Sequence, residues 1–177
     1  METDTIERRA DRASDPPTDS FEEFYAGTAD RVYRALAVTL ADIHLAREAA
    51  DEAMARAFVH WSKVARYDNP GGWVFRVGLN WATSWRRKLR RERALTDDSW
   101  PAAPAMDTGG LAASAALARL PVAQRAVVVC RVLFTLSTAE TAAVLRIAEG
   151  TVRSRLSRAI AALRRDLGAT KLREEER

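Results

Sequence analysis

Apolar residues recur at helical spacing over residues 151–167 and leave a basic face opposite them. The apolar positions follow one another at steps of four, four, three and four: Val152, Leu156, Ile160, Leu163 and Leu167. Such spacing predicts one amphipathic helix whose apolar stripe has to be covered by other helices. Ser154, Arg158 and Arg165 fall on the opposite side, and residues 151–165 contain no acid. The chain must therefore build a helical domain that keeps these cations outside.

The basic face of this helix admits two interpretations. Arg can pair bidentately with guanine and Ser can bond a base edge or a phosphate, so the face suits the major groove of B-DNA. The alternative is an ordinary solvated surface, which many charged helix faces are. For an isolated helix the residues do not decide between the two.

The residues immediately upstream favour DNA binding. Ser137 and Glu140 have the spacing of a capping box, with Ser137 as N-cap and Glu140 at the third helical position. Residues 141–145 complete a short helix, and residues 146–150 form a tight connector to the long one. A short helix, a turn and a basic amphipathic helix make a helix-turn-helix, whose second helix enters the groove. Together with the charge pattern, this predicts a DNA-binding unit.

Composition and cysteine content limit the class of protein. The 177 residues suffice for one medium domain or two small ones, and the net charge of +4 favours a polyanionic partner. The single Cys130 sits in an apolar run, which predicts a small buried side chain in a protein of the reducing cytoplasm. No apolar run approaches the roughly 20 residues that span a bilayer, so we expect no membrane insertion.

Signs of catalysis are absent from the sequence. His44 and His60 have no cysteine or acidic partner at a metal-ligand spacing. The sequence contains no glycine-rich phosphate loop, nucleophile elbow or metal motif. We therefore expect a binding protein without cofactor or metal, and not an enzyme.

The first half of the chain reads as helices with two-sided patterns. Asp42 is placed to cap a helix that runs to about His60. Its inward face carries Ala46, Ala50, Ala53, Met54, Ala57 and Trp61. Its outward face carries Glu48, Asp51 and Glu52, joined by Ala55 and Val59. Acids mixed with small apolar groups are compatible with a protein-docking surface, but on the residues alone a solvated acidic face is favoured.

A second basic helix is predicted from Pro70 to about Arg93, after a loop over residues 62–69. Asn69 is its cap, and residues 86–93 contain six cations and one acid, which attracts phosphates. Its apolar face is predicted to carry Val74, Val77, Trp81, Trp85 and Leu89. Its polar face is predicted to carry Arg76, Asn80, Thr83, Arg87, Arg90 and Arg91, with Ser84 at its edge. Trp81 and Trp85 are therefore expected in the core, whereas Tyr67 and Trp73 are candidates for stacking on bases.

These patterns predict an all-α fold of two small helical domains joined by a flexible linker. The linker is expected over residues 95–110, which are rich in Pro, Ala, Gly and Asp and lack periodicity. Further helices are expected over residues 111–120 and 122–134, with Val127, Val128, Cys130, Val132 and Leu133 in the core. The expected divisions are a disordered tail (1–20), a first domain (21–94), the linker, a helix-turn-helix domain (111–168) and a short charged tail (169–177).

Three segments together resemble a bacterial RNA polymerase sigma factor of the sigma-70 family. They are residues 21–36, residues 46–82 and residues 117–167, the last including GTVRSRLSRA. The resemblance runs in order from about Phe21 to Leu167 and is closest to the extracytoplasmic-function (ECF) group, which keeps only the second and fourth sigma domains. It implies an alternative sigma factor that binds core RNA polymerase, recognises a promoter and melts its DNA. The alternative, a stand-alone operator-binding regulator, needs a dimer face and a sensor domain, and neither is visible.

The resemblance also implies roles for individual residues. Contacts to the clamp helices of the largest catalytic-core subunit fall to Glu48, Asp51, Glu52, Ala55 and Val59, although the family usually has Gln at position 51. Contacts to the −10 element of promoter DNA fall to Lys63, Arg66, Tyr67, Asn69, Trp73, Arg76, Asn80, Ser84, Arg87 and Arg91. Contacts to the −35 element fall to Arg131, Thr151, Arg153, Ser154, Ser157, Arg158 and Arg165. An anti-sigma protein is a further candidate partner.

One position departs from the family pattern at the turn of the helix-turn-helix. Arg146 stands where Gly is usual. If this residue adopts a left-handed conformation, Arg should cost on the order of 1 kcal/mol there.

Overall fold

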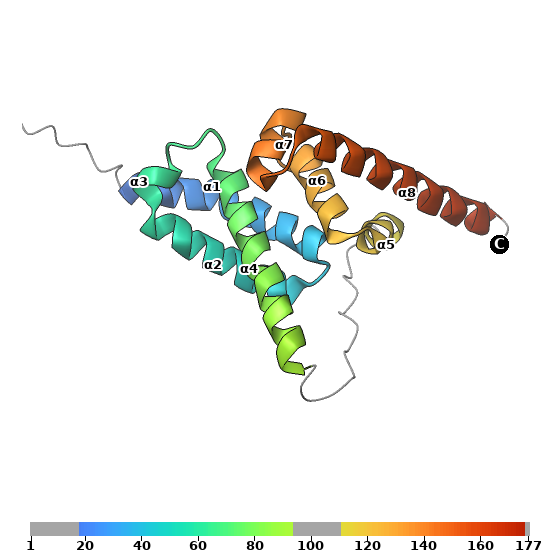
Figure 1. The fold of residues 1–177 in the computed structure, drawn as a ribbon, viewed down its shortest axis with the longest axis horizontal. Helices are drawn as coiled ribbons and strands as arrows, with labels where there is room; N and C mark the ends of the chain where they lie inside the picture. Colours follow the sequence, from blue (N-terminus) through green and yellow to red (C-terminus); the bar gives the residue numbers. More distant parts are fainter. Residues whose placement is uncertain (1–17, 94–110, 176–177) are drawn as a thin grey trace, which may run out of the picture.

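Only α-helices are found in the part of the chain that this computed structural model describes, residues 18–93 and 111–175 (Figure 1). They are α1 (Thr18–Leu40), α2 (Ile43–Val59), α3 (Trp61–Val64), α4 (Pro70–Arg93), α5 (Leu111–Arg119), α6 (Val122–Val132), α7 (Thr138–Leu145) and α8 (Glu149–Glu175). The all-α class predicted from the sequence is confirmed. None of the described helices is long and apolar enough to cross a membrane.

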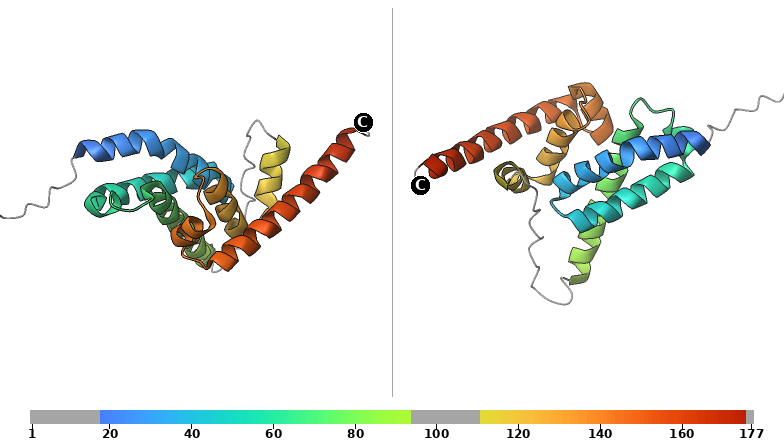
Figure 2. Two further views of the ribbon diagram at one scale, coloured as in Figure 1. Left: turned by 90° about the horizontal axis from the view of Figure 1, so that it is seen from above. Right: turned by 180° about the vertical axis from the view of Figure 1, so that it is seen from behind.

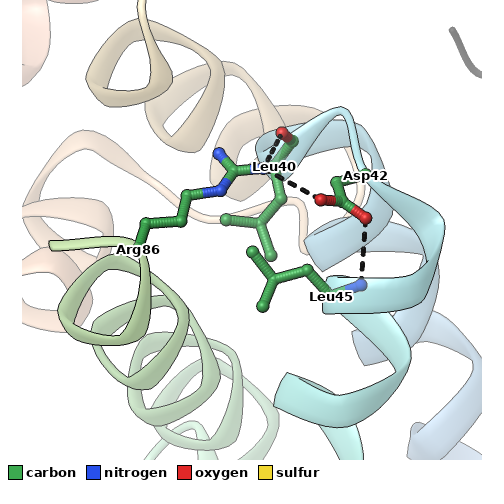
Figure 3. Close-up of polar contacts among 4 residues, drawn as sticks. All are labelled: Leu40, Asp42, Leu45 and Arg86. Atoms are coloured by element: carbon green, nitrogen blue, oxygen red, sulfur yellow. Dashed lines mark hydrogen bonds and ion pairs between the residues drawn. The ribbon is translucent and has the colours of Figure 1, made fainter. Parts of the chain in front are cut away.

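Helices α1, α2 and α4 form the first packed group, and a polar corner fixes their geometry. Asp42 has extended backbone angles, and its carboxylate accepts a hydrogen bond from the Leu45 N–H at 3.0 Å, which confirms it as the N-cap of α2. Arg86 of α4 donates to the Leu40 carbonyl at 3.1 Å and to the Asp42 carboxylate at 3.3 Å (Figure 3). One guanidinium therefore holds α4 against the turn between α1 and α2. The alanine face predicted for α2 is buried as expected.

The buried face of α4 differs from the predicted stripe. Phe75, Gly78 and Ala82 are buried together with Val74, whereas Trp85 is 44% exposed and stacks on Trp81 at a ring distance of 5.9 Å. The core position predicted for Trp85 is thus wrong. The reason lies at Gly78, where a Cβ would come within 2.8 Å of Leu36 Cδ1 and 2.9 Å of the Ala49 carbonyl oxygen. Small residues bring α4 close to α1 and α2, and this rotates the bulky tryptophan away.

Helices α6, α7 and α8 form the helix-turn-helix group. Val127, Ala142 and Val152 are its buried centre, with Leu156 packed against them. The capping box is confirmed, since the Ser137 hydroxyl accepts from the Glu140 N–H at 3.2 Å and the Glu140 carboxylate accepts from the Ser137 N–H at 2.7 Å. The ion pair between Arg119 and Asp166, at 3.2 Å, links α5 to α8.

The apolar stripe predicted on α8 is covered only over its first turns. Val152 and Ala159 are fully buried, but Ile160 is 39% exposed and Leu167 is 36% exposed. Helix α8 extends beyond the helices that could cover it, as the view from above shows (Figure 2). Likewise Val132 and Leu133 were expected in the core and are exposed, because α6 ends there.

Several boundaries differ from the sequence expectation. Helix α1 begins at Thr18, so the last three residues of the expected 1–20 tail are helical. The expected 62–69 loop begins with the single turn of α3. Helix α8 continues through Gly168 to Glu175, where a short tail was expected. The rest of the N-terminal tail and the linker over residues 95–110 lie outside the described residues.

The two groups of helices share one core. The Phe75 ring of α4 lies 5.5 Å from the Phe134 ring, just after α6, and the Arg31 guanidinium lies 5.4 Å from the centre of the Phe134 ring. Cys130 and Leu136 belong to the same buried cluster as the residues of α1, α2 and α4. Helices α6 and α7 therefore pack directly on α1 and α4 (Figures 1 and 2).

Candidate nucleic-acid and protein interfaces

The first turns of α8 present the basic face predicted for −35 recognition. Arg153, Ser157 and Arg158 are exposed, and so is Arg165 two turns beyond Arg158. Arg153 is paired with Glu149 at 3.2 Å within the helix. Among the described residues, neither Ser157 nor Arg158 has a bonding partner, so both side chains are available to a ligand.

Three other residues of this predicted set are engaged within the protein. The Ser154 hydroxyl donates to the Thr151 carbonyl at 3.1 Å, and both residues are half-buried. Arg131 is half-buried and donates to the Leu136 carbonyl, which supports the loop between α6 and α7. These contacts engage the Ser154 and Arg131 side chains in the free protein, whereas Thr151 contributes only its backbone carbonyl.

The turn between α7 and α8 is left-handed at Arg146, the case in which a cost was expected for Arg. Arg146 has φ 53° and ψ 50°, and its N–H donates to the Ala143 carbonyl at 3.4 Å. Such a conformation closes a helix well but is strained for any residue other than Gly or Asn. Hydrogen bonds from Ser137 lower the pKa of the Glu140 carboxyl at the other end of α7. Both ends of this short helix are therefore fixed by local chemistry.

Replacing Arg146 with glycine should stabilise the free protein by up to about 1 kcal/mol, because Gly adopts the left-handed region without strain. Equilibrium urea unfolding of both proteins measures the difference. The same change at Arg155, which is half-buried in the body of α8, should instead destabilise by about 1 kcal/mol. Equal destabilisation by both substitutions would contradict the strain at Arg146.

Residues predicted for −10 recognition line a cavity of about 270 Å³ at the start of α4. Tyr67 and Trp73 stack with ring centres 6.2 Å apart. The Asn69 side chain caps α4 by accepting from the Gly72 N–H at 2.6 Å. Burial lowers the pKa of the Arg76 guanidinium, Arg146 lowers it further, and Tyr67 opposes the shift. The site thus joins two aromatic rings and two cations.

The opposite wall of this cavity belongs to the helix-turn-helix group. Glu140, Ala143, Val144 and Arg146 line it. A Cβ on Gly72 would come within 2.8 Å of Val144 Cγ2, which shows how closely α4 and α7 approach. Sequence reasoning missed these residues, because no local pattern indicates a contact across about 70 positions. The remaining residues of the predicted −10 set are exposed outside the cavity: Lys63, Arg66, Asn80, Ser84, Arg87 and Arg91.

The outward face of α2 combines acids with large apolar groups. Glu48, Asp51 and Ala55 are exposed, and Val59 is 72% exposed. Glu52 is half-buried and bound to Arg56, with 2.7 Å between Oε1 and Nε.

A hollow of about 300 Å³ adjoins this face between α1 and α2. Phe21, Tyr25, Asp51 and Phe58 are among the residues that line it. Phe58 is 55% exposed and Tyr25 is 47% exposed, which is unusual for side chains of this size. Phe58 was not predicted for this surface, although it follows Asp51 by seven positions and so shares its helix face.

Residues 18–93 and 111–175 contain no group of three or more His, Cys, Asp or Glu side chains placed to hold a metal ion.

Comparisons with known proteins agree with this architecture. The family described as Sigma-70, region 4, matches residues 111–163. The RNA polymerase sigma-E factor of Streptomyces coelicolor is 34% identical over 167 residues, covering 89% of this chain and 94% of its own. The ECF RNA polymerase sigma factor SigM of Mycobacterium tuberculosis is 39% identical over 128 residues, covering 68% of this chain and 65% of its own.

A solved structure has the same fold. It is the sigma factor RpoE of Bartonella quintana in complex with the anti-sigma factor NepR, with a TM-score of 0.72, 21% identity and coverage of 85% of this chain and 98% of the other. The fold match, the region 4 match and identity to sigma-E over nearly the whole chain agree with one another. The chain therefore belongs to the ECF group of the sigma-70 family of bacterial RNA polymerase sigma factors.

Proposed function

We propose that this alternative sigma factor divides promoter recognition among three surfaces of the chain. The α2 face binds core RNA polymerase, the Tyr67–Trp73 end of α4 binds −10 DNA, and the start of α8 binds −35 DNA. The observation that carries this assignment is the exposed, unpartnered Ser157 and Arg158 on a helix that follows a capped short helix and a left-handed turn. This is the arrangement that a major groove accepts.

At the −35 element, we assign different roles to the first turns and to the later turns of the basic face of α8. Arg158 lies at the centre of the face, where it can pair bidentately with a guanine edge. Arg165 lies two turns further on, where it can neutralise a phosphate. Base readout therefore falls to the first turns of α8, and general attraction falls to the later ones.

At the −10 element, the aromatic cavity suits a base that has left the melted strand. Flipping a base costs a few kcal/mol, which stacking on Tyr67 and Trp73 and cationic contacts to phosphates can offset. Lys63, Arg87 and Arg91 are exposed and well placed by charge for those phosphates. Because α7 forms one wall of the cavity in the free protein, we infer that α7 moves away when DNA enters.

Polymerase binding accounts for the composition of the α2 face. Exposed apolar groups at Phe58 and Val59 can be buried against a partner, and Glu48 and Asp51 supply a charged rim. The polymerase then performs the chemistry, and the sigma factor contributes binding alone. An operator-binding regulator, the alternative function, gains no support, because the named relatives are sigma factors.

By analogy, the proposal includes an anti-sigma protein as an additional partner. The solved structure with the same fold was crystallised with the anti-sigma factor NepR. Core polymerase, promoter DNA and such a regulator would all meet this chain in the cytoplasm.

Replacing Glu48 with lysine tests the polymerase interface. Glu48 is exposed, so its reversal should leave the fold intact but weaken binding to core polymerase at least tenfold, because a like charge at an interface is unfavourable. Titration of labelled protein with core enzyme gives the affinity. The control is Asp30→Lys, the same charge reversal at an exposed position of α1. It should change the affinity for core polymerase less than twofold. An unchanged affinity of the Glu48 variant would remove α2 from the interface.

A further inference from the structure

A second cavity, of about 580 Å³, lies where α4 crosses the junction between the two groups of helices. Arginines dominate its lining: Arg86, Arg87 and Arg90 come from α4, and Arg125 comes from α6. Among the described residues, none that lines this cavity is acidic. Four arginines from two different helices thus line one space.

Arg125 is the most unusual of the four. It is only 5% exposed, and its Nη1 donates to the Ala118 carbonyl at 2.8 Å. Its Nε is buried and has no hydrogen-bond partner among the described residues. Native proteins rarely leave a buried donor unpaired, and a buried cation without a counter-charge is particularly unfavourable. The guanidinium of Arg125 is therefore satisfied at Nη1 but has no acceptor at Nε among the described residues.

The other three arginines of the cavity bring no free counter-charge that could balance Arg125. Arg86 uses Nη2 to bind the Leu40 carbonyl and the Asp42 carboxylate (Figure 3). Asp42 is thus one carboxylate set against four guanidinium groups. Arg87 and Arg90 are exposed and have no acidic partner in the described ranges. Burial lowers the pKa of the Arg125 guanidinium, and the charge of Arg86 lowers it further.

We propose that this cavity binds a small oligophosphate anion, either pyrophosphate itself or the diphosphate group of a nucleotide. Guanidinium groups pair bidentately with phosphate oxygens, and an oligophosphate carries enough negative charge to balance several of them. The cavity is too large for a single halide ion to bridge its walls. The deep position of Arg125 favours a small ligand over the backbone of a nucleic acid.

Bridging by such an anion has a consequence for the arrangement of the helices. Arg125 and the three arginines of α4 belong to the two groups whose contact also forms the −10 cavity. A ligand that binds both groups stabilises their packed arrangement. Resting on the function proposed above, we infer that the anion opposes entry of −10 DNA.

Binding of pyrophosphate to the purified full-length chain tests the site directly. Calorimetric titration at constant ionic strength should show saturable binding at about one anion per chain. Arg90→Gln should weaken binding at least fivefold. Arg91→Gln is the matched control, because it removes the same charge from the next exposed position outside the cavity, and it should change affinity less than twofold. Both variants lie on the exposed side of α4 and should unfold at the same urea concentration as the parent, which keeps the comparison valid.

The results of this titration distinguish an oligophosphate site from a nucleotide site, a nucleic-acid site and no site. Absence of saturable binding, or equal weakening by both variants, would overturn the site and leave Arg125 only as the cap of α5. Tighter binding of adenosine diphosphate than pyrophosphate would identify a nucleotide as the ligand class, and equal affinity would identify the bare oligophosphate. Stronger binding of a short single strand lacking a −10 sequence, with the same dependence on Arg90, would overturn the proposal in favour of nucleic acid.

A separate measurement tests whether the anion opposes entry of −10 DNA. Saturating pyrophosphate should weaken binding of a fluorescent −10 single strand at least threefold for the parent, but not for Arg90→Gln. Because the calorimetric titration contains neither polymerase nor promoter, a failure of anion binding leaves the sigma function untouched. A failure of −10 binding without anion would instead count against the proposed function.

Discussion

Replacing Phe75 with alanine should destabilise the free protein by about 3–5 kcal/mol, the cost of removing a large aromatic side chain from a packed core. Phe75 has no exposed surface and belongs to the main buried cluster. Such a loss approaches the whole stability of a typical domain, so the variant should be partly unfolded at 37 °C. Urea unfolding followed by circular dichroism gives the value.

Phe134 provides the informative partner in this experiment. Its ring lies 5.5 Å from Phe75 but follows α6, in the other group of helices. If the shared core forms in solution, a double-mutant cycle should give a coupling of about 0.5–1.5 kcal/mol. Val132→Ala, at a 67% exposed position nearby, should cost less than about 0.5 kcal/mol. Zero coupling, with two separate unfolding transitions, would show that the groups fold independently.

Replacing Arg158 with alanine should cost on the order of 1–3 kcal/mol in binding the cognate −35 sequence and should relax the preference at one base pair. The side chain is exposed and makes no contact that the fold requires, so circular dichroism should not change. Holoenzyme binding to promoters with each −35 base varied measures both effects.

Arg165→Ala is the matched control for this substitution. Arg165 is equally exposed on the same helix, but it lies beyond the turns that meet base edges. Its loss should weaken binding about equally on every sequence and lower the salt dependence by about one phosphate contact. An altered base preference for Arg165→Ala, with Arg158→Ala neutral, would mean that the other end of α8 enters the groove.

Features of the fold that depend on residues adjacent in the sequence were predictable. Asp42, Asn69 and Ser137 all cap helices as their sequence contexts indicated, because capping is decided within four residues. The strain at Arg146 was predicted only for the case that this residue is left-handed, and the structure has it in that conformation. Local chemistry is therefore readable from the sequence alone.

Features that depend on close approach between helices were not predictable. The spacing of bulky residues placed Trp85 in the core. In the structure, Gly78 and Ala82 lie where α4 packs against α1 and α2. The charged faces of α2 and α8 were located correctly as exposed surfaces, since charge periodicity is local. The contribution of α7 to the −10 cavity was missed, because the packing of α7 on α4 depends on a fit between distant side chains.

The position of Cys130 makes its thiol a built-in reporter of transient opening of the shared core. This thiol, the chain's single cysteine, has no exposed surface in the shared core, and burial raises its pKa to about 12. Alkylation needs both access and a thiolate, so it can proceed only during excursions in which α6 leaves α1 and α4. Each modified molecule has therefore opened at least once. The alkylation rate measures this opening without any introduced label.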